Sequence, residues 1–472
     1  MSSSKPSSIR GGKEAQADHF NVKDAPASHG RLSFFDKTPP GNAARGVYLK
    51  TVIGGTFMMM ILIFTILAIY WAALYRTPVR NLHGWVVDFD GGVVGQIVSQ
   101  GLALNQGLGK ITWEVLPASA FPGGPEELAQ AVRHEDAWTA VSINPGASDR
   151  LTAALLAPNS AYDGAQAITG YGVEARNENA FRVLIRPSLQ GALDVISRRF
   201  AQETAKRVAN SSVLPSIMAT APQTIVAPIY YTIDNLIPFD QPVATAATFV
   251  GMLLQLILGF FVVMIAFSAR EASGYDKTLS VRALIVLRLV TCFSAYFILS
   301  LCFALLNLAF KIDVSRKFGH GGGFMALWMV NYIGMLAVVL ALESLITLLT
   351  PKGMPFFMLL WIISNLAVSI FPIELLPVVF RYGYAAPFYN LSKAIRVIVF
   401  GTRNRIGMSV GILFAWIAIS CISLSLIQWF VRRKDPPTPP SSDSSSEESV
   451  AATAQERLKG GETVDRDLVG GA

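Results

Sequence analysis

The chain has 472 residues, of which 52% are apolar and only 15% are charged, and its mean hydropathy is +0.44. Soluble proteins carry about a quarter of their residues as charged side chains, so this composition excludes a disordered chain and argues against a purely soluble protein. The net charge of +7 does not indicate nucleic-acid binding, because the basic residues flank long apolar runs, where a membrane explains them better.

The first apolar run, residues 51–75, contains no charged side chain. About 20 helical residues cross the hydrocarbon core of a bilayer, and the run lacks a small-residue cleavage site, so it predicts an uncleaved signal anchor. Further spans are predicted at residues 244–267, 284–310, 323–349, 353–371 and 407–430. The predicted fold class is therefore a multi-pass α-helical membrane protein with six spans. Residues 375–380 are too short to cross and suit a re-entrant or interfacial piece.

The basic residues predict the orientation of these spans, because cytosolic flanks collect Lys and Arg. The strongest basic cluster precedes the first span, so we expect both termini to be cytosolic and residues 76–243 to face the other side. Two predicted outer loops also carry basic residues, which oppose this orientation: Lys311, Arg316, Lys317, Arg381, Lys393, Arg396, Arg403 and Arg405.

The two ends of the chain are low in complexity. Residues 1–46 are polar and residues 433–472 form an acidic tail, so we predict that both are disordered and cytosolic. Between them we expect a first transmembrane helix (47–75), an extracytosolic α/β domain (76–243) and a five-helix permease-like domain (244–432). Ser444 and Ser445 each precede a Glu by three residues, a pattern that suits an acid-directed kinase, but a merely solvating tail is the favoured interpretation.

Strand and helix patterns alternate through the outer domain and predict an α/β or α+β fold. Strand-type runs occupy residues 85–89, 111–115, 137–143 and 181–185. Helical spacing marks residues 94–104, 125–133, 147–156 and a long amphipathic helix that begins near Pro187. Residues 224–231 look extended. Asn210 and Asn390 lie in glycosylation sequons on the predicted outer side.

Motifs for catalysis are missing from the sequence. The string at 107–111 lacks two residues of a phosphate-binding loop, and the G-x-S-x-G string at 407–411 opens a predicted membrane helix with no histidine after it. We therefore expect no enzyme, no cofactor and no metal site. Asp88 and Asp90 could form a carboxylate pair, but a strand-ending turn or helix cap is the favoured interpretation.

Polar side chains inside predicted spans are costly in lipid and usually face a bundle interior. Arg288 and Glu343 lie at similar depths in neighbouring antiparallel spans, so we expect an ion pair that either locks two helices or handles substrate or protons. Asn307 and Asn331 share the outer half of the same two helices. Further polar candidates in other spans are Gln255 and Asn365.

Four strings carry a resemblance to a known family: WAALYR at 71–76, VVDFDGGVVG at 86–95, AWTAVSINPGAS at 137–148 and RYGYAAPFYNLSKAIRVIVFGTRN at 381–404. Together they resemble the fungal nitrosoguanidine-resistance family. Its layout of one span, a large outer domain and a five-span block is similar to ABC-type-2 permeases and bacterial phage-infection-protein relatives. The resemblance implies a fungal plasma-membrane protein linked to drug resistance and membrane-lipid homeostasis, and it implies no catalytic residues.

Two functions are compatible with these features. The first is a permease-like protein that transports or exports an amphipathic toxic compound or a lipid. The second is a non-transporting membrane scaffold or stress-signalling regulator, which the absence of an ATPase motif in the chain favours. The expected partners are membrane lipids, small amphipathic toxic compounds and a second copy of the chain, and not nucleic acid.

Overall fold

A computed structural model describes residues 34–35 and 37–434 of the chain. The chain divides into two compact units between Ile63 and Phe64. In the first unit, α1 (Pro39–Leu62) begins after Thr38, whose side chain accepts a hydrogen bond from the backbone N of Gly41. This contact satisfies one of the N–H groups that the first helical turn leaves unpaired.

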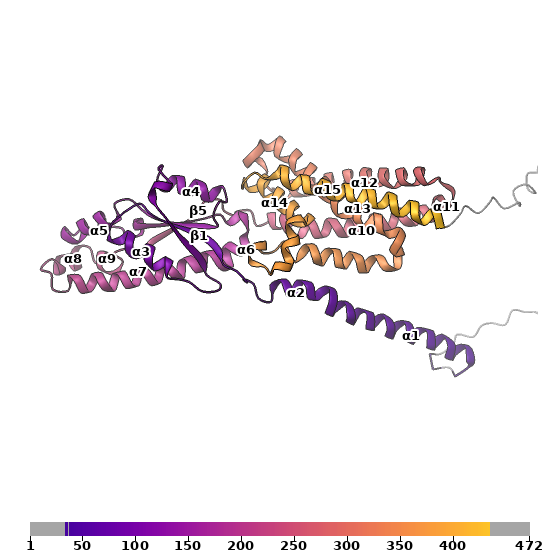
Figure 1. Ribbon diagram of the computed structural model, residues 1–472, viewed down its shortest axis with the longest axis horizontal. Helices are drawn as coiled ribbons and strands as arrows, with labels where there is room; N and C mark the ends of the chain where they lie inside the picture. Colours follow the sequence, from indigo (N-terminus) through magenta and orange to yellow (C-terminus); the bar gives the residue numbers. More distant parts are fainter. Residues whose placement is uncertain (1–33, 36, 435–472) are drawn as a thin grey trace, which may run out of the picture. The chain divides into compact units, whose positions relative to one another are not determined.

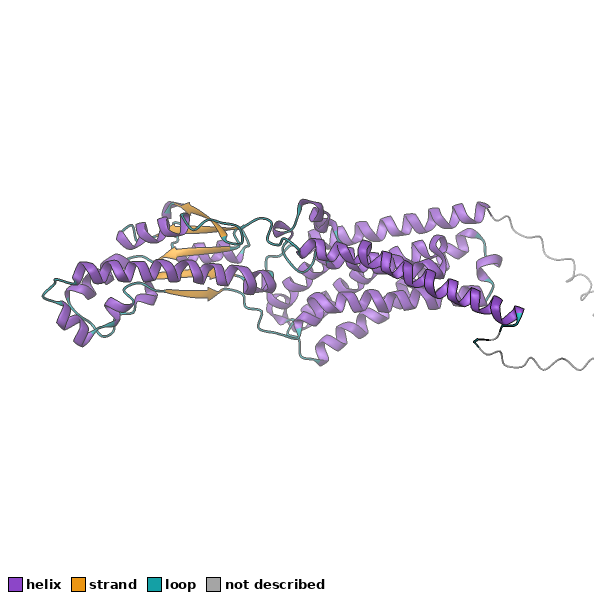
Figure 2. Ribbon diagram, turned by 90° about the horizontal axis from the view of Figure 1, so that it is seen from below, coloured by secondary structure: helices purple, strands orange, loops and turns teal. Residues whose placement is uncertain are grey.

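The second unit contains a five-stranded mixed sheet in the order β2-β1-β3-β4-β5 (Figure 2). The strands are β1 (Leu82–Asp88), β2 (Ile111–Leu116), β3 (Thr139–Ile143), β4 (Ile168–Gly172) and β5 (Tyr231–Asn235). All neighbouring strands are parallel except β3 and β4, which are antiparallel. The central strand β3 is buried at every position, as expected for a strand that is covered on both faces.

Helices cover both faces of this sheet (Figure 1). They are α3 (Val93–Ala103), α4 (Pro125–Arg133), α5 (Ala147–Leu156) and α7 (Arg186–Val208). Successive side chains of a strand point to opposite faces, so Val86 packs with α3, α5 and α7 whereas Val87 packs with α4. The predicted α/β character and the predicted bounds of α4 and α5 are confirmed.

The predicted strand at 181–185 is wrong. These residues form a π-helical turn, η5 (Phe181–Ile185), which continues directly into α7. Phe181, Leu184 and Ile185 are all buried at helical spacing, and the same apolar stripe continues to Leu189 beyond Pro187. Proline is tolerated there because it lies in the first turn of α7.

The sequence analysis missed β4, whose sequence ITGYG contains two glycines and gives little strand signal. The glycines permit close packing, because an added Cβ at Gly170 would lie 2.7 Å from Leu189 Cδ2 and one at Gly172 would lie 2.5 Å from Phe181 Cε2. Residues 224–231 are not extended throughout. They begin within α9 (Gln223–Val226) and reach β5 only at Tyr231.

Asp88 and Asp90 form a turn that joins β1 to α3. Asp88 Oδ1 accepts hydrogen bonds from the backbone N atoms of Asp90 and Gly91, both at 2.9 Å. Asp90 accepts from the backbone N of Gly92 and from both the N and Oγ of Ser148. Burial acts to raise the pKa of Asp90, but the hydrogen bonds from Ser148 and its neighbours lower it overall. The turn interpretation is confirmed.

Five helices in the described residues are long and apolar enough to cross a membrane: Pro39–Leu74, Ala246–Ala272, Val281–Ala309, Ser315–Leu366 and Ile406–Arg433. The chain is a multi-pass membrane protein, but the predicted count of six spans is not confirmed. The corresponding helices of the second unit are α2 (Ala68–Leu74), α10 (Gly251–Ala272), α12 (Val281–Ala309), α13 (Ser315–Leu366) and α15 (Ile406–Lys434).

The predicted fourth and fifth spans lie in α13, a run of 52 residues. Its helical backbone is interrupted at Gly319 and at Thr350. Trp361 Nε1 donates a hydrogen bond to the Val338 carbonyl at 3.1 Å. In a straight helix these two residues would be about 35 Å apart, so the chain folds back at Thr350. The second arm, residues 351–366, is about 24 Å long, which is shorter than the roughly 30 Å hydrocarbon core.

Residues 373–400 were expected to form an outer loop with one short apolar piece. Instead, two 3₁₀ turns, η7 (Ile373–Leu375) and η8 (Val378–Ala385), lead into a helix, α14 (Pro387–Phe400). Nearly every side chain of α14 is buried, and the helix packs against α13 and α15. A helix that is buried on nearly all sides lies in the interior of the bundle, where polar side chains such as Asn390 and Arg396 need partners.

The remaining short elements connect these parts. They are η1 (Ile63–Leu67), η2 (Ala118–Ala120), η3 (Gly164–Ala167), η4 (Glu174–Arg176), α6 (Glu178–Ala180), α8 (Leu214–Thr220), η6 (Ala246–Val250) and α11 (Tyr275–Thr278).

The turn between β1 and α3 gives a prediction about stability. An added Cβ at Gly95 would lie 2.1 Å from Asp88 Oδ1, so we expect Gly95→Ala to lower the free energy of unfolding by about 1–3 kcal/mol. Gly191, an exposed glycine of α7 with nothing near its Cβ position, is the matched control. Gly191→Ala should leave stability unchanged or raise it by about 0.5–1 kcal/mol. Thermal unfolding of the purified full chain measures both, and equal melting temperatures would contradict the proposed close contact.

Candidate functional site

Arg288 of α12 and Glu343 of α13 form a fully buried ion pair, with 2.7 Å between Arg288 Nε and Glu343 Oε1. A second guanidinium nitrogen of Arg288 donates to the Glu343 backbone carbonyl. Arg288 Nη1 also donates to Thr347 Oγ1 and to Gln428 Oε1, each at 2.7 Å. The pair therefore contacts α15 as well as the two helices on which it was predicted.

A second arginine, Arg270 at the end of α10, shares the same carboxylate, with 3.2 Å between its Nη1 and Glu343 Oε1. Arg270 lies beyond the apolar run at 244–267 that predicted this span, so the sequence analysis did not place it beside the pair. Asp276, which is partly exposed, lies 3.6 Å from Arg270 Nε. Glu343 Oε2 is buried without a hydrogen-bond partner. We name Arg270, Arg288 and Glu343 the buried charge cluster.

The other polar candidates within the bundle form hydrogen bonds mostly with main-chain groups or with one another. Gln255 Nε2 donates to Asn331 Oδ1 at 2.8 Å, so this pair joins α10 to α13. Asn307 Nδ2 donates to the Phe303 carbonyl of its own helix at 2.9 Å. Asn365 donates to the Trp361 carbonyl and accepts from the backbone N of Phe388 at 3.2 Å.

Ion pairs join the α/β domain to the opposite end of the helices from the buried charge cluster. Arg396 of α14 lies 2.6 Å from Glu178 Oε2 and donates to the Ala175 carbonyl at 2.9 Å. Arg403 lies 2.8 Å from Asp136. Similarly, Arg316 at the start of α13 lies 2.6 Å from Asp240. Several of the basic residues that opposed the predicted orientation thus neutralise carboxylates of the α/β domain.

Glu174 holds the end of the α/β domain in place. Its carboxylate accepts hydrogen bonds from Arg182, from Asn235 Nδ2 and from the backbone N of Phe239. Burial acts to raise the pKa of Glu174, but these hydrogen bonds lower it overall. Because the Phe239 ring packs against the Phe400 ring in a tilted arrangement, with 4.6 Å between ring centroids, this carboxylate also fixes a contact with α14.

A polar cavity of about 280 Å³ lies between the α/β domain, the η7–η8 segment, α14 and the start of α15. Its charged lining residues are Glu135, Arg176, Glu374, Lys393 and Arg405. Arg176 stacks on Trp138, 3.5 Å from the ring centroid, and lies 3.7 Å from Glu135. Desolvation lowers the pKa of both Arg176 and Lys393. Burial raises the pKa of Tyr389, which also lines this cavity.

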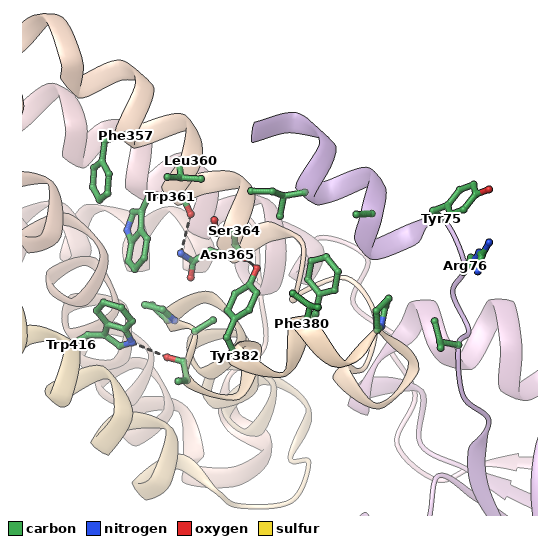
Figure 3. Close-up of a pocket in the computed structure, with 18 residues that line it drawn as sticks. Tyr75, Arg76, Phe357, Leu360, Trp361, Ser364, Asn365, Phe380, Tyr382 and Trp416 are labelled. Carbon is green, nitrogen blue, oxygen red and sulfur yellow. Dashed lines mark hydrogen bonds between the residues drawn. The ribbon is translucent and has the colours of Figure 1, made fainter. Parts of the chain in front are cut away.

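A larger cavity of about 1140 Å³ is lined almost entirely by apolar and aromatic side chains (Figure 3). Trp361 and Trp416 lie at one end in the figure, with Tyr75 and Arg76 at the other. The lining comes from α2 and the residues after it, the second arm of α13, η8 and α15. We name this the apolar cavity. No sequence pattern indicated it, because its lining comes from several segments that are distant in sequence.

The two sequons differ in accessibility. Asn210 is exposed in the turn after α7. Asn390 is buried in α14, and its Nδ2 donates to the carbonyls of Tyr384 and Ala386. This fold has no room for a glycan on Asn390, so that candidate is wrong. The phosphorylation candidates Ser444 and Ser445 lie outside the described residues. Within the described part of the chain, no group of His, Cys, Asp and Glu side chains could hold a metal ion.

The buried charge cluster gives a second prediction. Glu343→Gln would leave the buried Arg288 without an anion and Arg270 with only the partly exposed Asp276, so we expect a loss of about 3–5 kcal/mol in stability. The fraction of purified protein that elutes as a monodisperse peak, together with its melting temperature, measures the loss. Glu271→Gln, which changes an exposed carboxylate next to Arg270, should behave as wild type. A normal yield of Glu343→Gln would show that the cluster does not hold the bundle.

Exchange of the two charges tests the role of Arg270. Arg288→Glu combined with Glu343→Arg should fail to restore the yield. Arg270 would then face an arginine at position 343, where the wild type has a carboxylate. Recovery to the wild-type yield would contradict the three-residue arrangement.

Glycosylation gives a further prediction. If the α/β domain faces the lumen or the exterior, the protein should carry one N-linked glycan, on the exposed Asn210. We expect Asn210→Gln to abolish the mobility shift that an endoglycosidase produces, and Asn390→Gln to leave that shift unchanged. A shift that survives Asn210→Gln would contradict the burial of Asn390, and no shift in the wild type would contradict the orientation.

Comparison with known proteins agrees with this architecture. Residues 55–422 match a family described as "Protein of unknown function (DUF3533)". The chain is also 26% identical over 471 residues to an uncharacterized endoplasmic reticulum membrane protein of Saccharomyces cerevisiae, a match that covers 89% of this chain and 87% of that protein. No solved structure matches the chain. Because the family match extends from the first apolar helix through the α/β domain into α15, the chain belongs to the DUF3533 family of membrane proteins.

Proposed function

We propose that the protein is permease-like and takes lipids or amphipathic toxic compounds from the bilayer, and so contributes to drug resistance by export or by membrane-lipid homeostasis. The apolar cavity is the observation that carries this proposal. Ligand pockets typically have volumes of about 300–1,000 Å³ and mainly apolar walls, and this one has about 1140 Å³. The four strings that resemble the nitrosoguanidine-resistance family support the link to toxic compounds.

The lining of the apolar cavity suits an amphipathic molecule. Trp361 and Trp416 present flat apolar faces, and the indole N–H of each is already bonded to a backbone carbonyl. Tyr382 likewise donates its hydroxyl to the Ser364 carbonyl at 2.7 Å. With these polar atoms satisfied, the walls offer apolar surface to a hydrocarbon chain or a ring system, and Arg76 adds a charge for a polar end.

The alternative is a non-transporting scaffold or stress-signalling regulator. The lack of an identified energy source for transport favours this alternative. The sequence contains no phosphate-binding loop, and the buried charge cluster is held by hydrogen bonds from several helices.

In either case we propose that both termini are cytosolic. We also propose a plasma-membrane location, with the endoplasmic reticulum membrane of the yeast relative as the competing compartment. The α/β domain would face the lumen in one and the exterior in the other.

Filling the apolar cavity tests the proposal. Ala72 lines the cavity and is exposed, so Ala72→Trp should obstruct it without disturbing a packed core. In a yeast host without its own relative, we expect wild type to raise tolerance to amphipathic toxic compounds and Ala72→Trp to lose most of that gain at equal protein level. Ala418→Trp, an exposed alanine of α15 outside the cavity lining, is the matched control.

Full protection by Ala72→Trp would contradict a role for the apolar cavity. Purified protein in proteoliposomes then separates transport from regulation. Efflux of a labelled amphipathic compound under an imposed ion gradient, blocked by Ala72→Trp, supports the permease. Cavity-dependent resistance without any efflux supports the regulator instead.

A further inference from the structure

The polar cavity lies beside the apolar cavity, at the ends of the membrane helices next to the α/β domain. Met408 and Ile412 of α15 line the polar cavity, and Trp416 lines the apolar one. One helical turn separates Ile412 from Trp416, about 6 Å along the axis. The η8 segment contributes to both, with Tyr384 on the polar side and Ala385 on the apolar side. A molecule with a polar head and a hydrocarbon chain could therefore contact both.

The charges in the polar cavity are mixed, with one cation in excess. Three cationic side chains, Arg176, Lys393 and Arg405, face two carboxylates, Glu135 and Glu374. Of these, only Arg176 and Glu135 lie within ion-pair distance of each other among the described residues. Both side chains of that pair are largely buried, at 15% and 11% exposure. The remaining two cations and one carboxylate are available to a ligand.

Lys393 is the best-placed cation for a ligand. It lies on α14 and is half-buried, and its ammonium lies 4.8 Å from the centroid of the Tyr389 ring. Among the described residues no hydrogen bond or carboxylate within ion-pair distance neutralises it, whereas Arg396 and Arg403 nearby are paired with Glu178 and Asp136. A half-buried ammonium without an anion is energetically costly, and an anionic ligand would remove that cost.

Glu135, the carboxylate that pairs with Arg176, has an unusual backbone conformation. Its backbone has φ of 63°, the left-handed conformation that follows α4 and that glycine adopts most easily. A glutamate at such a position carries backbone strain. Its carboxylate is directed to Arg176 at the cavity, so it orients that guanidinium toward the same space.

We propose that the polar cavity binds the phosphate-bearing headgroup of an anionic aminophospholipid, while the lipid's acyl chain occupies the apolar cavity. Lys393 and Arg405 face the phosphate and the serine carboxylate, and Glu374 faces the amine. A serine headgroup carries one net negative charge and one amine, which complements three cations and two carboxylates. This inference rests on the proposed handling of amphipathic molecules and specifies their class.

The test is native mass spectrometry of the delipidated full chain in detergent, titrated with phosphatidylserine or phosphatidylcholine of the same acyl chains. We expect wild type to bind phosphatidylserine about tenfold more tightly, as one or two charge-assisted hydrogen bonds would give. Lys393→Met should abolish the preference, and Lys393→Arg should retain it. Arg405→Gln, at an exposed position where folding is not at risk, should reduce it. The control Lys317→Met, at an exposed lysine of α13, should bind as wild type.

Soluble competitors identify the source of the phosphate. Displacement of the lipid by glycerophosphoserine, but not by the same concentration of inorganic phosphate, supports a headgroup site. Displacement by inorganic phosphate assigns the site to free phosphate and overturns the lipid inference. An unchanged preference in both Lys393→Met and Arg405→Gln overturns it as well.

The Ala72→Trp variant separates this inference from the proposed function. We expect it to weaken both lipids equally and to leave the ratio between them unchanged, because it alters only the apolar cavity. A wild type without any headgroup preference, but with binding that Ala72→Trp weakens, would refute the headgroup site and leave the proposed function standing. Lipid binding that Ala72→Trp does not affect would instead contradict the proposed role of the apolar cavity.

Discussion

Glu343 is a buried anion that two arginines from different helices share, and the helical bundle depends on this contact. A buried charge that loses its partner costs several kcal/mol, so α10 and α12 must both meet α13 at the depth of Glu343. The hydrogen bond from Arg288 to Gln428 adds α15 to the same point. One carboxylate therefore fixes the depth and rotation of four helices, and with them the positions of the helix ends beside the α/β domain.

At those helix ends the basic residues pair with carboxylates from outside the helical bundle. The basic residues there are unusual for a predicted outer surface, but Arg316, Arg396 and Arg403 each meet a carboxylate of the α/β domain or the segment after it. The domain therefore supplies the anions that the helical block lacks. This arrangement couples the two parts: removal of the domain would take from Arg396 both Glu178 and the Ala175 carbonyl, so neither part is electrostatically complete alone.

Sequence periodicity predicted the parts of the fold that one segment determines by itself. The helices α4 and α5, the strand β2 and the apolar character of the long helices follow from local spacing and composition. It failed where a distant segment decides. The glycine-containing β4 is a strand because α7 packs on it. The reversal of α13 at Thr350, in contrast, falls between the two spans predicted at 323–349 and 353–371. Arg270 reaches Glu343 only because α10 extends past its apolar run, and each cavity is lined by several segments that are distant in sequence, so neither feature had a local signal.

The intramembrane amides illustrate how a polar residue in a span can serve the backbone and not a substrate. Non-helical backbone at membrane depth is stable only where its N–H and C=O groups find partners. Asn365 accepts from Phe388 N, Asn390 donates to the Tyr384 and Ala386 carbonyls, and Trp416 donates to the Ala385 carbonyl. These side chains hold the segment that separates the polar and apolar cavities. Because this segment is fixed from both sides, the two cavities keep a constant spacing, which is what recognition of a molecule with one polar and one apolar end requires.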